Sequence, residues 1–273
     1  MSRPVVQGPV GAAIALRGDA SANALFDEWL GERRQPCSLF LDVDGTLLDI
    51  AESPDAVHVP RELRVALESL HRQLDGALAL ISGRPVDSLD RLFAPLRLPS
   101  CGGHGDHWRV NADEPLHREA AQFLPDPVRQ RLQALACAHA DILTEDKGSS
   151  FALHYRLAPA AGPLLESALR ALLSEPGATG LRLLSGKMVF EVIAHSCDKA
   201  QAIRRFLEMP PFAGRRPLFI GDDVTDEPAL AMMPALGGLA LSVGRLLPGA
   251  SASFANAASV RSALGRAAER RLQ

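Results

Sequence analysis

With 273 residues, 47% of them hydrophobic and 22% charged, the chain has the composition of an ordinary globular protein of one large domain or two modest ones. Its formal net charge of −3 and pI near 6.2 give no basis for binding nucleic acid or an anionic membrane. No apolar run approaches the roughly 20 residues that a membrane-spanning helix needs, so we expect no membrane association.

Residues 1–35 are a predicted lead-in to the main fold, with one short helix at Ser21–Glu32. The apolar run Val10–Leu16, with Arg3 upstream, has the rough outline of a secretion signal. The run is short, however, and Gly8-Pro9 breaks the chain directly before it, so we expect a cytoplasmic protein. The four cysteines lie far apart and include no Cys-x-x-Cys pair, so we expect neither a zinc site nor a set of disulfides. Buried thiols are typical of the reducing cytoplasm. The cysteines are Cys37, Cys101, Cys137 and Cys197.

The first predicted strand of the main fold, Ser38–Leu41, ends in two carboxylates, Asp42 and Asp44, followed by Gly45. Side chains two apart on an extended segment point the same way. Asp42 and Asp44 therefore converge beyond the carboxyl end of the strand, where open α/β sheets bind their ligands. Their mutual repulsion favours a divalent hard cation such as Mg²⁺. The alternative is an ordinary Asp-Gly turn without function.

A second predicted strand, Ala77–Ile81, follows a helix that begins at Pro60, and it ends in the small polar run Ser82-Gly83-Arg84. A Ser hydroxyl followed by backbone N–H groups near a helix start suits a phosphate group. We therefore expect Ser82 and Gly83 to bind a phosphoryl group. For Arg84, a phosphate contact and a structural ion pair both remain open.

After a third short strand at Pro99–Gly103, the simple alternation of strand and helix stops between residues 111 and 193. This segment predicts an α/β layer of antiparallel character, inserted as a cap over the carboxyl ends of the parallel sheet. The predicted helices are Asp126–Ala140 and Pro163–Leu173, and the strands are Ile142–Thr144, Ser150–Arg156, Leu181–Leu184 and Lys187–Ile193. The main domain then comprises residues 36–110 and 194–273.

The predicted cap carries polar residues that suit the hydroxyl groups of a sugar. His154 and Arg156 are two apart on one predicted strand, and Lys187 and Glu191 are four apart on another, so each pair shares a face. Lys147 lies shortly before the first of these strands. A solvated surface with ordinary ion pairs is the alternative for this cluster.

The return to the main domain begins with a predicted helix that Asp198 caps. Lys199 in the first turn would interact unfavourably with the helix dipole, which points to another task, such as neutralising a phosphate. The next strand, Pro217–Ile220, ends in four carboxylates within six residues, an arrangement that is unfavourable without a cation. EF-hand spacing is absent. The predicted metal ligands here are Asp222, Asp223 and Asp226.

The rest of the chain predicts a helix from Glu227 through Met233 and a strand at Gly237–Val243. A loop at Gly244–Ala258 and an amphipathic helix at Ser259–Arg271 follow.

The motifs at Asp42, Ser82, Lys199 and Asp222 resemble the four motifs of the haloacid-dehalogenase superfamily of phosphatases. The resemblance implies a Rossmann-like doubly wound parallel sheet with an inserted α/β cap. It implies Asp42 as the nucleophile and Asp44 as the general acid and base, with Ser82 and Lys199 on the phosphoryl group. The implied ligands of Mg²⁺ are Asp42, the backbone carbonyl of Asp44, and Asp222, supported by Asp223 or Asp226.

Segments in and beside the cap narrow the resemblance to the trehalose-6-phosphate phosphatase family. They are His104-Gly105 through Arg109, Lys147-Gly148, His154-Tyr155-Arg156 and the run from Gly186 to Val192. In that family the residues at the positions of Arg109, Lys187 and Glu191 hold the sugar. The further predicted substrate-binding residues are Ser82, Gly83, Arg84, His104, Lys147, His154 and Arg156. His107 departs from the family pattern, which usually has an acidic residue there.

The resemblance implies an enzyme that releases trehalose and phosphate from trehalose 6-phosphate, functionally partnered with a trehalose-6-phosphate synthase. We expect a monomer or weak oligomer. One alternative is a capped phosphatase of another phosphosugar, such as sucrose phosphate or mannosyl-3-phosphoglycerate. The others are a non-catalytic sugar-phosphate-binding regulatory module and a phosphomutase of the same fold.

Overall fold

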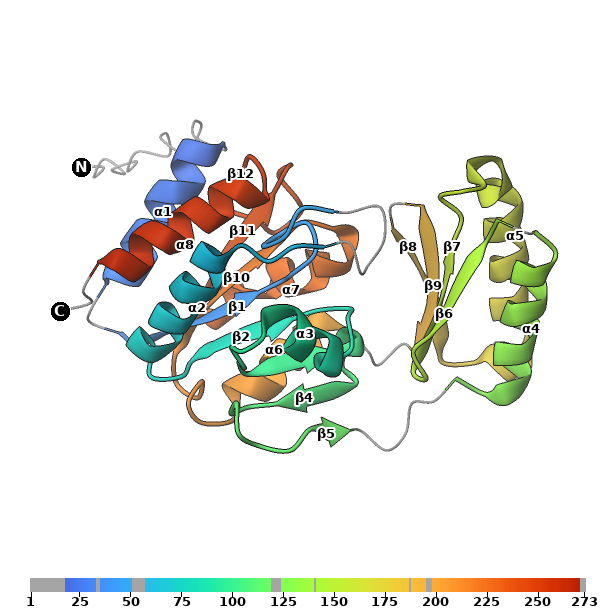
Figure 1. The fold of residues 1–273 in the computed structure, drawn as a ribbon, viewed down its shortest axis with the longest axis horizontal. Coiled ribbons are helices and arrows are strands. Elements are labelled where there is room, and N and C mark those ends of the chain that lie inside the picture. Colours follow the sequence, from blue (N-terminus) through green and yellow to red (C-terminus); the bar gives the residue numbers. More distant parts are fainter. Residues whose placement is uncertain are drawn as a thin grey trace, which may run out of the picture.

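The computed structural model describes residues 18–32, 35–50, 57–118, 124–139, 141–186, 188–194 and 198–270. The predicted signal-like run before residue 18 lies outside them, as do Lys187 and Cys197. Two separate sheets organise the chain, one of eight strands and one of four, each with its own helices (Figure 1). None of the described helices has the length and apolar character to cross a membrane.

The larger sheet has the strand order β12-β11-β10-β1-β2-β3-β4-β5. Its six parallel strands are β1 (Cys37–Leu41), β2 (Leu78–Ile81), β3 (Ser100–Gly102), β10 (Arg216–Gly221), β11 (Leu239–Val243) and β12 (Ala252–Phe254). The antiparallel edge is formed by β4 (His107–Arg109) and β5 (His117–Arg118). Every residue of β1 is buried, as expected for a central strand of a sheet covered on both faces.

Helices cover both faces of this sheet. Helices α1 (Asp19–Gly31), α2 (Arg61–Gln73) and α8 (Ala257–Glu269) pack against one another in one layer (Figure 1). The other helices of this domain are α3 (Val86–Phe93), α6 (Lys199–Leu207) and α7 (Glu227–Met232). Of these, α6 and α7 contact each other. The rings of Phe40, Phe206 and Phe212 pack together in the core between β1 and α6, with Phe40 and Phe212 stacked and Phe206 edge-on to both. The doubly wound parallel sheet predicted from the sequence is thus confirmed.

The smaller sheet is antiparallel throughout, with the order β6-β7-β9-β8. Its strands are β6 (Leu143–Asp146), β7 (Ser150–His154), β8 (Leu181–Gly186) and β9 (Val189–Ala194), and its helices are α4 (Asp126–Cys137) and α5 (Gly162–Leu173). Side chains such as Leu132, Leu169, Phe151 and Val192 form a second hydrophobic core between these helices and one face of the sheet. The other face of the sheet is turned toward the larger domain (Figure 1).

Several predicted boundaries differ from the observed ones. Strand β5 pairs with β4, so by strand pairing the inserted segment begins after Arg118 rather than at residue 111. The predicted loop at Gly244–Ala258 contains β12, and α3 was not predicted. Strand β7 ends at His154 and β9 begins at Val189. Arg156 therefore lies beyond the end of the observed strand β7, and Lys187 is outside the described residues. Strands β5 and β12 have only two and three residues, which is too short for an alternating pattern to reveal them.

Candidate active site

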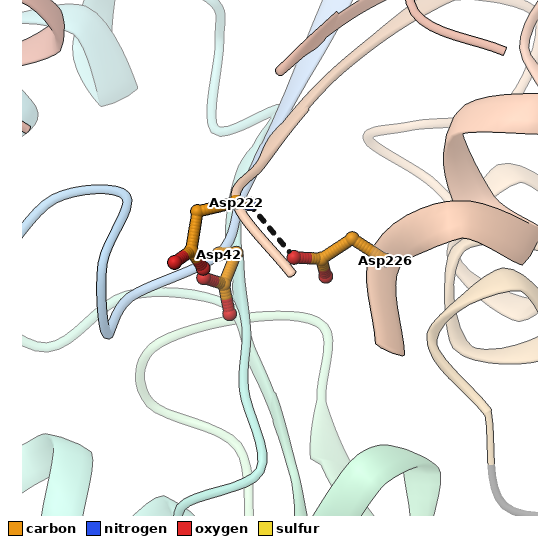
Figure 2. Close-up of side chains that lie close together, drawn as sticks. All are labelled: Asp42, Asp222 and Asp226. Carbon is orange, nitrogen blue, oxygen red and sulfur yellow. Dashed lines mark hydrogen bonds between the residues drawn. The ribbon is translucent and has the colours of Figure 1, made fainter. Parts of the chain in front are cut away.

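Three carboxylates converge at the carboxyl ends of β1 and β10: Asp42, Asp222 and Asp226 (Figure 2). Each offers one oxygen atom, and these atoms lie within 4.8 Å of one another. The two strands are parallel neighbours, with Leu41 opposite Ile220, so the residue that follows each strand emerges at the same edge. Gly45 has φ +85° and leaves space for this cluster, because a Cβ atom there would overlap the Asp222 carboxylate.

The ammonium group of Lys199 lies inside this cluster. Its Nζ donates to Asp42 Oδ1 at 2.6 Å and to Asp226 Oδ1 at 2.5 Å. Helix α6 begins at Lys199, and the Asp198 side chain caps that helix by accepting a hydrogen bond from Gln201 N. A lysine in the first turn interacts unfavourably with the helix dipole. At Lys199 this is offset by contacts with two carboxylates, Asp42 and Asp226, that lie far from it in the sequence.

Asp226 is fully buried and heavily hydrogen-bonded. Its Oδ2 accepts from the backbone N–H groups of Asp222 at 2.9 Å and Asp223 at 3.1 Å, in addition to the Lys199 bond on Oδ1. The Asp223 side chain instead accepts from Val224 N and caps the turn Val224–Asp226. The sequence left open whether Asp223 or Asp226 supports the metal site. In the structure, Asp226 belongs to the carboxylate cluster and Asp223 lies outside it.

Burial is the largest single influence on the pKa values of Asp42 and Lys199, and charged neighbours act against it in both. Burial raises the pKa of Asp42 well above its ordinary value, the attraction of Lys199 opposes that rise, and the neighbouring Asp226 and Asp222 add to it. Burial alone would lower the pKa of Lys199, but Asp226 and Asp42 outweigh it, so the pKa is raised and the ammonium stays charged. With three carboxylates and one ammonium group, the cluster retains excess negative charge. An all-oxygen donor set of this charge fits a hard divalent cation such as Mg²⁺.

Asp44 lies beside this cluster and is held by Arg84. The guanidinium donates from Nε to Asp44 Oδ2 and from Nη2 to Asp44 Oδ1, both at 2.7 Å. Of the two roles left open for Arg84, the structure shows this bidentate ion pair. Arg84 N also donates to Ser82 Oγ at 3.1 Å, and Ser82 is buried. The hydroxyl hydrogen of Ser82 is not used in that bond. Gly83 joins these two residues at the end of β2.

The turn Gly103–Gly105 joins this site to the smaller domain. Gly103 N donates to Arg84 O at 3.1 Å. A Cβ atom at Gly103 would lie 3.5 Å from His107 Nδ1 and 3.6 Å from Ser149 Oγ, so the β6–β7 turn of the smaller domain meets the larger domain here. His107, which departs from the family pattern, therefore lies at the contact between the two domains. The backbone of His104 is in this turn, but its side chain lies outside the described part of the structure.

Arg109 is a core residue in this structure, not a sugar contact. Its side chain is fully buried, and its guanidinium binds Asp90 through both Nη atoms and Leu98 O through Nε. All of these groups belong to α3 and the segment before β3, so the arginine fastens that corner of the sheet. The predicted sugar-binding role of Arg109 is inconsistent with this packing, because the guanidinium has no exposed surface.

The open face of the smaller sheet carries a second polar cluster. Lys147 Nζ lies 3.1 Å from Glu191 Oε1, which also accepts a hydrogen bond from Ser150 Oγ at 2.5 Å. Glu145 adds a second carboxylate near Lys147, and His154 contacts Glu145. Arg156 is exposed in the turn after β7. The structure thus groups Lys147, His154 and Glu191 with Glu145 and Ser150.

Glu145 and Ser150 were not among the predicted binding residues. The sequence held a usable signal for Glu145, because it lies two residues before Lys147 on an extended segment and so shares its face. Ser150 had no such signal, since its contact with Glu191 depends on the pairing of β7 with β9.

Comparison with known proteins agrees with this geometry. A model of the trehalose-phosphatase family matches residues 40–245, which include all four motifs and the inserted segment. A probable trehalose-phosphate phosphatase of Sinorhizobium fredii is 43% identical over 79% of this chain and 80% of its own length. The trehalose-6-phosphate phosphatase of Escherichia coli is 38% identical over 75% of this chain and 76% of its own length.

The fold is shared more widely. The C-terminal domain of the Candida albicans trehalose-6-phosphate phosphatase superposes with a TM-score of 0.77 at 21% identity, covering 92% of this chain and 96% of that one. The family model spans residues 40–245, which include Asp42, Asp222 and Asp226, and each bacterial relative matches at least 75% of the chain. The chain belongs to the trehalose-phosphatase family.

Proposed function

We propose that this protein hydrolyses trehalose 6-phosphate to trehalose and phosphate in a Mg²⁺-dependent reaction through an aspartyl-phosphate intermediate. The observation that carries the proposal is the buried group of Asp42, Lys199 and Asp226 beside Asp222, which supplies a nucleophile, a fixed cation and oxygen ligands at one sheet edge. Family membership supports the choice of substrate.

Asp42 is the nucleophile of the proposal. One of its carboxylate oxygens attacks phosphorus, the bond from phosphorus to the sugar oxygen breaks, and an acyl phosphate forms, which divides one difficult displacement into two easier ones. Lys199 supports this step in two ways: it holds the carboxylate through Oδ1, and its positive charge stabilises the charge on the transferring group. Asp226 orients Lys199 from the opposite side.

Asp44 is the acid and base of the proposal. It gives a proton to the departing sugar oxygen and afterwards takes a proton from the water that attacks the acyl phosphate. The bidentate contact with Arg84 fixes the position of the Asp44 carboxylate. The Ser82 hydroxyl and the backbone N–H group of Gly83 are the proposed donors to the phosphoryl oxygens.

The proposed ligands of Mg²⁺ are Asp42, the backbone carbonyl of Asp44, and Asp222, with Asp226 as a positioning group. When bound, the cation supplies charge neutralisation between the carboxylates and the phosphate and polarises a phosphoryl oxygen. We assign Asp226 a positioning role because both of its carboxylate oxygens already accept hydrogen bonds.

The smaller domain, for which we propose the role of a cap, binds the sugar through its open sheet face. Lys147 and Glu191 are the central residues of that face, and together they offer donors and an acceptor for sugar hydroxyls. The two domains already approach each other where Ser149 lies next to Gly103. The backbone N–H of Gly103 in turn donates to the carbonyl oxygen of Arg84. Closure of the cap over the sheet edge excludes bulk water from the phosphoryl group.

The proposed role includes a functional partnership with a trehalose-6-phosphate synthase, because the reaction needs a source of its phosphorylated disaccharide. We also infer a cytoplasmic location. The thiol of Cys37, which is buried and forms no disulfide in the described structure, supports a reducing compartment.

The test is phosphate release from trehalose 6-phosphate with Mg²⁺ and with a chelator, beside glucose 6-phosphate and sucrose 6-phosphate. We expect metal-dependent release from the trehalose ester alone. Equal release from all three esters would retain the catalytic assignment and refute the substrate. No release from any ester would refute the enzymatic function and favour a binding module.

A further inference from the structure

The loop of residues 43–48, called the Asp44 loop below, is closed by its own backbone hydrogen bonds. Val43 O accepts from the N–H groups of Leu47 at 2.9 Å and Leu48 at 3.0 Å. Asp44 and Leu48 also form an isolated β-bridge. Because these bonds tie the two ends of the loop together, the position of Asp44 depends on where Leu47 and Leu48 are held.

Arg261 on α8 binds the end of the Asp44 loop. Its Nη1 donates to Leu47 O at 2.9 Å, and its Nη2 donates to Asp49 Oδ2 at 3.0 Å. Leu47 is fully buried, whereas the Asp49 side chain is 73% exposed, so water weakens the ion pair more than the bond to the backbone carbonyl. One planar guanidinium therefore fixes two points of the chain, two residues apart.

Helix α8 gives this contact a rigid base. Val260 and Leu264, on either side of Arg261 in the helix, are fully buried, and α8 packs against α2. Asn256 caps the helix, because its side chain accepts a hydrogen bond from Ser259 N at 3.0 Å. Arg261 thus reaches the Asp44 loop from an element whose own position is fixed by the core.

The other side of the Asp44 loop faces the catalytic cluster. Gly45 lies directly against the Asp222 carboxylate, and the Asp44 carboxylate accepts two bonds of 2.7 Å from Arg84. Arg84 holds the end of the Asp44 side chain. It does not hold the backbone from which that side chain projects, which is the part of the loop that Arg261 fastens.

We propose that Arg261 is a positioning residue for the general acid and base Asp44, which holds the backbone of the Asp44 loop so that the carboxylate reaches the leaving oxygen and the attacking water. This inference rests on the proposed function, in which Asp44 transfers both protons. Proton transfer needs the acid within hydrogen-bond reach of the reacting oxygen, and a displacement of about 1 Å can lower a rate about a hundredfold. Arg261 acts on the reaction through the loop and touches no reacting atom.

The experiment compares phenyl phosphate with 2,4-dinitrophenyl phosphate in the full-length protein with Mg²⁺. Dinitrophenolate is a weak base and leaves without a proton, whereas phenolate needs one from Asp44. Release of the phenol in a single turnover, with enzyme in excess, reports only the formation of the acyl phosphate. We expect Arg261→Met to slow this release about tenfold for phenyl phosphate and less than about twofold for the dinitrophenyl ester.

Steady-state turnover of both esters should fall in Arg261→Met, because the second step needs Asp44 as a base whichever phenol has left. Arg261→Lys keeps the charge without the fork and should give intermediate rates. Asp49→Asn removes only the exposed contact and should stay near wild type. The matched control is Arg266→Met, which removes an exposed contact of the same helix with Asn23 and should keep both rates. Circular dichroism and thermal melting check that each variant folds.

The double variant Asp44→Asn/Arg261→Met tests whether Arg261 acts through Asp44. If it does, Arg261→Met slows the release from phenyl phosphate by less than about twofold once Asp44 is asparagine. A full additional loss in the double variant would overturn the inference. An unchanged rate for phenyl phosphate in Arg261→Met would also overturn it, as would equal losses on the two esters, which would mean that Arg261 supports the nucleophile.

Failure of the proposed function gives a different result. A wild-type protein that hydrolyses the aryl esters but releases no phosphate from trehalose 6-phosphate would refute the substrate. The comparison of the two aryl esters would still support or overturn the role of Arg261, because neither ester contains a sugar.

Discussion

Replacing Arg109 by methionine is expected to destabilise the core without weakening sugar binding. The side chain is fully buried, and the substitution removes both of its bonds to Asp90 and its bond to Leu98 O. Removing one partner of a buried ion pair costs about 3–5 kcal/mol. Asp90 is 24% exposed, so water stabilises part of the carboxylate left behind. We therefore expect a loss of about 3 kcal/mol in the free energy of unfolding, at the low end of that range.

Urea unfolding followed by circular dichroism measures this loss, and thermal melting should show a midpoint lower by about 5–10 °C. Arg97→Met is the matched control, because Arg97 also approaches Asp90, at 3.5 Å, but is 49% exposed. Its cost should stay within about 0.5 kcal/mol. KM for trehalose 6-phosphate, measured on folded Arg109→Met, should stay within about twofold of wild type. An unchanged free energy of unfolding together with a raised KM would refute this reasoning and restore Arg109 to the sugar site.

Four further outcomes test the site. Asp42→Asn should lower kcat by at least about a thousandfold and leave the circular dichroism spectrum unchanged, and retained activity would mean that another residue is the nucleophile. Adding Mg²⁺ should raise the thermal midpoint of the wild type but much less that of Asp222→Asn, and an equal rise in both would place the cation elsewhere. Arg84→Met should lower kcat about tenfold or more, because Asp44 loses its bidentate partner, whereas an unchanged kcat would separate the two residues. Glu191→Ala should raise KM for trehalose 6-phosphate more than it slows phenyl phosphate hydrolysis, and equal losses on both substrates would refute a sugar-specific role.

Local features of the sequence determined much of the catalytic edge. The apolar runs before Asp42, Ser82 and Asp222 predicted buried parallel strands, and parallel strands carry the residues that follow them to a common edge. Lys199 was singled out because its place in the first turn of a helix is locally unfavourable. Each of these signals is complete within a few residues, so one stretch of chain was enough to interpret it.

Only the tertiary structure decided which charged groups meet. Arg84 and Asp44 are 40 residues apart in the chain, and Lys199 and Asp42 are 157 apart, so no local pattern reports either contact. The same applies to Arg109, whose sequence position beside the cap favoured a sugar contact but whose side chain points into the core, toward Asp90. Strand periodicity specifies the face on which a side chain lies, whereas its partners depend on which strands pair and in what register. The candidate catalytic residues could therefore be identified from the sequence. The contacts that fix their positions and influence their charge arise from the packing of segments that are distant in the chain.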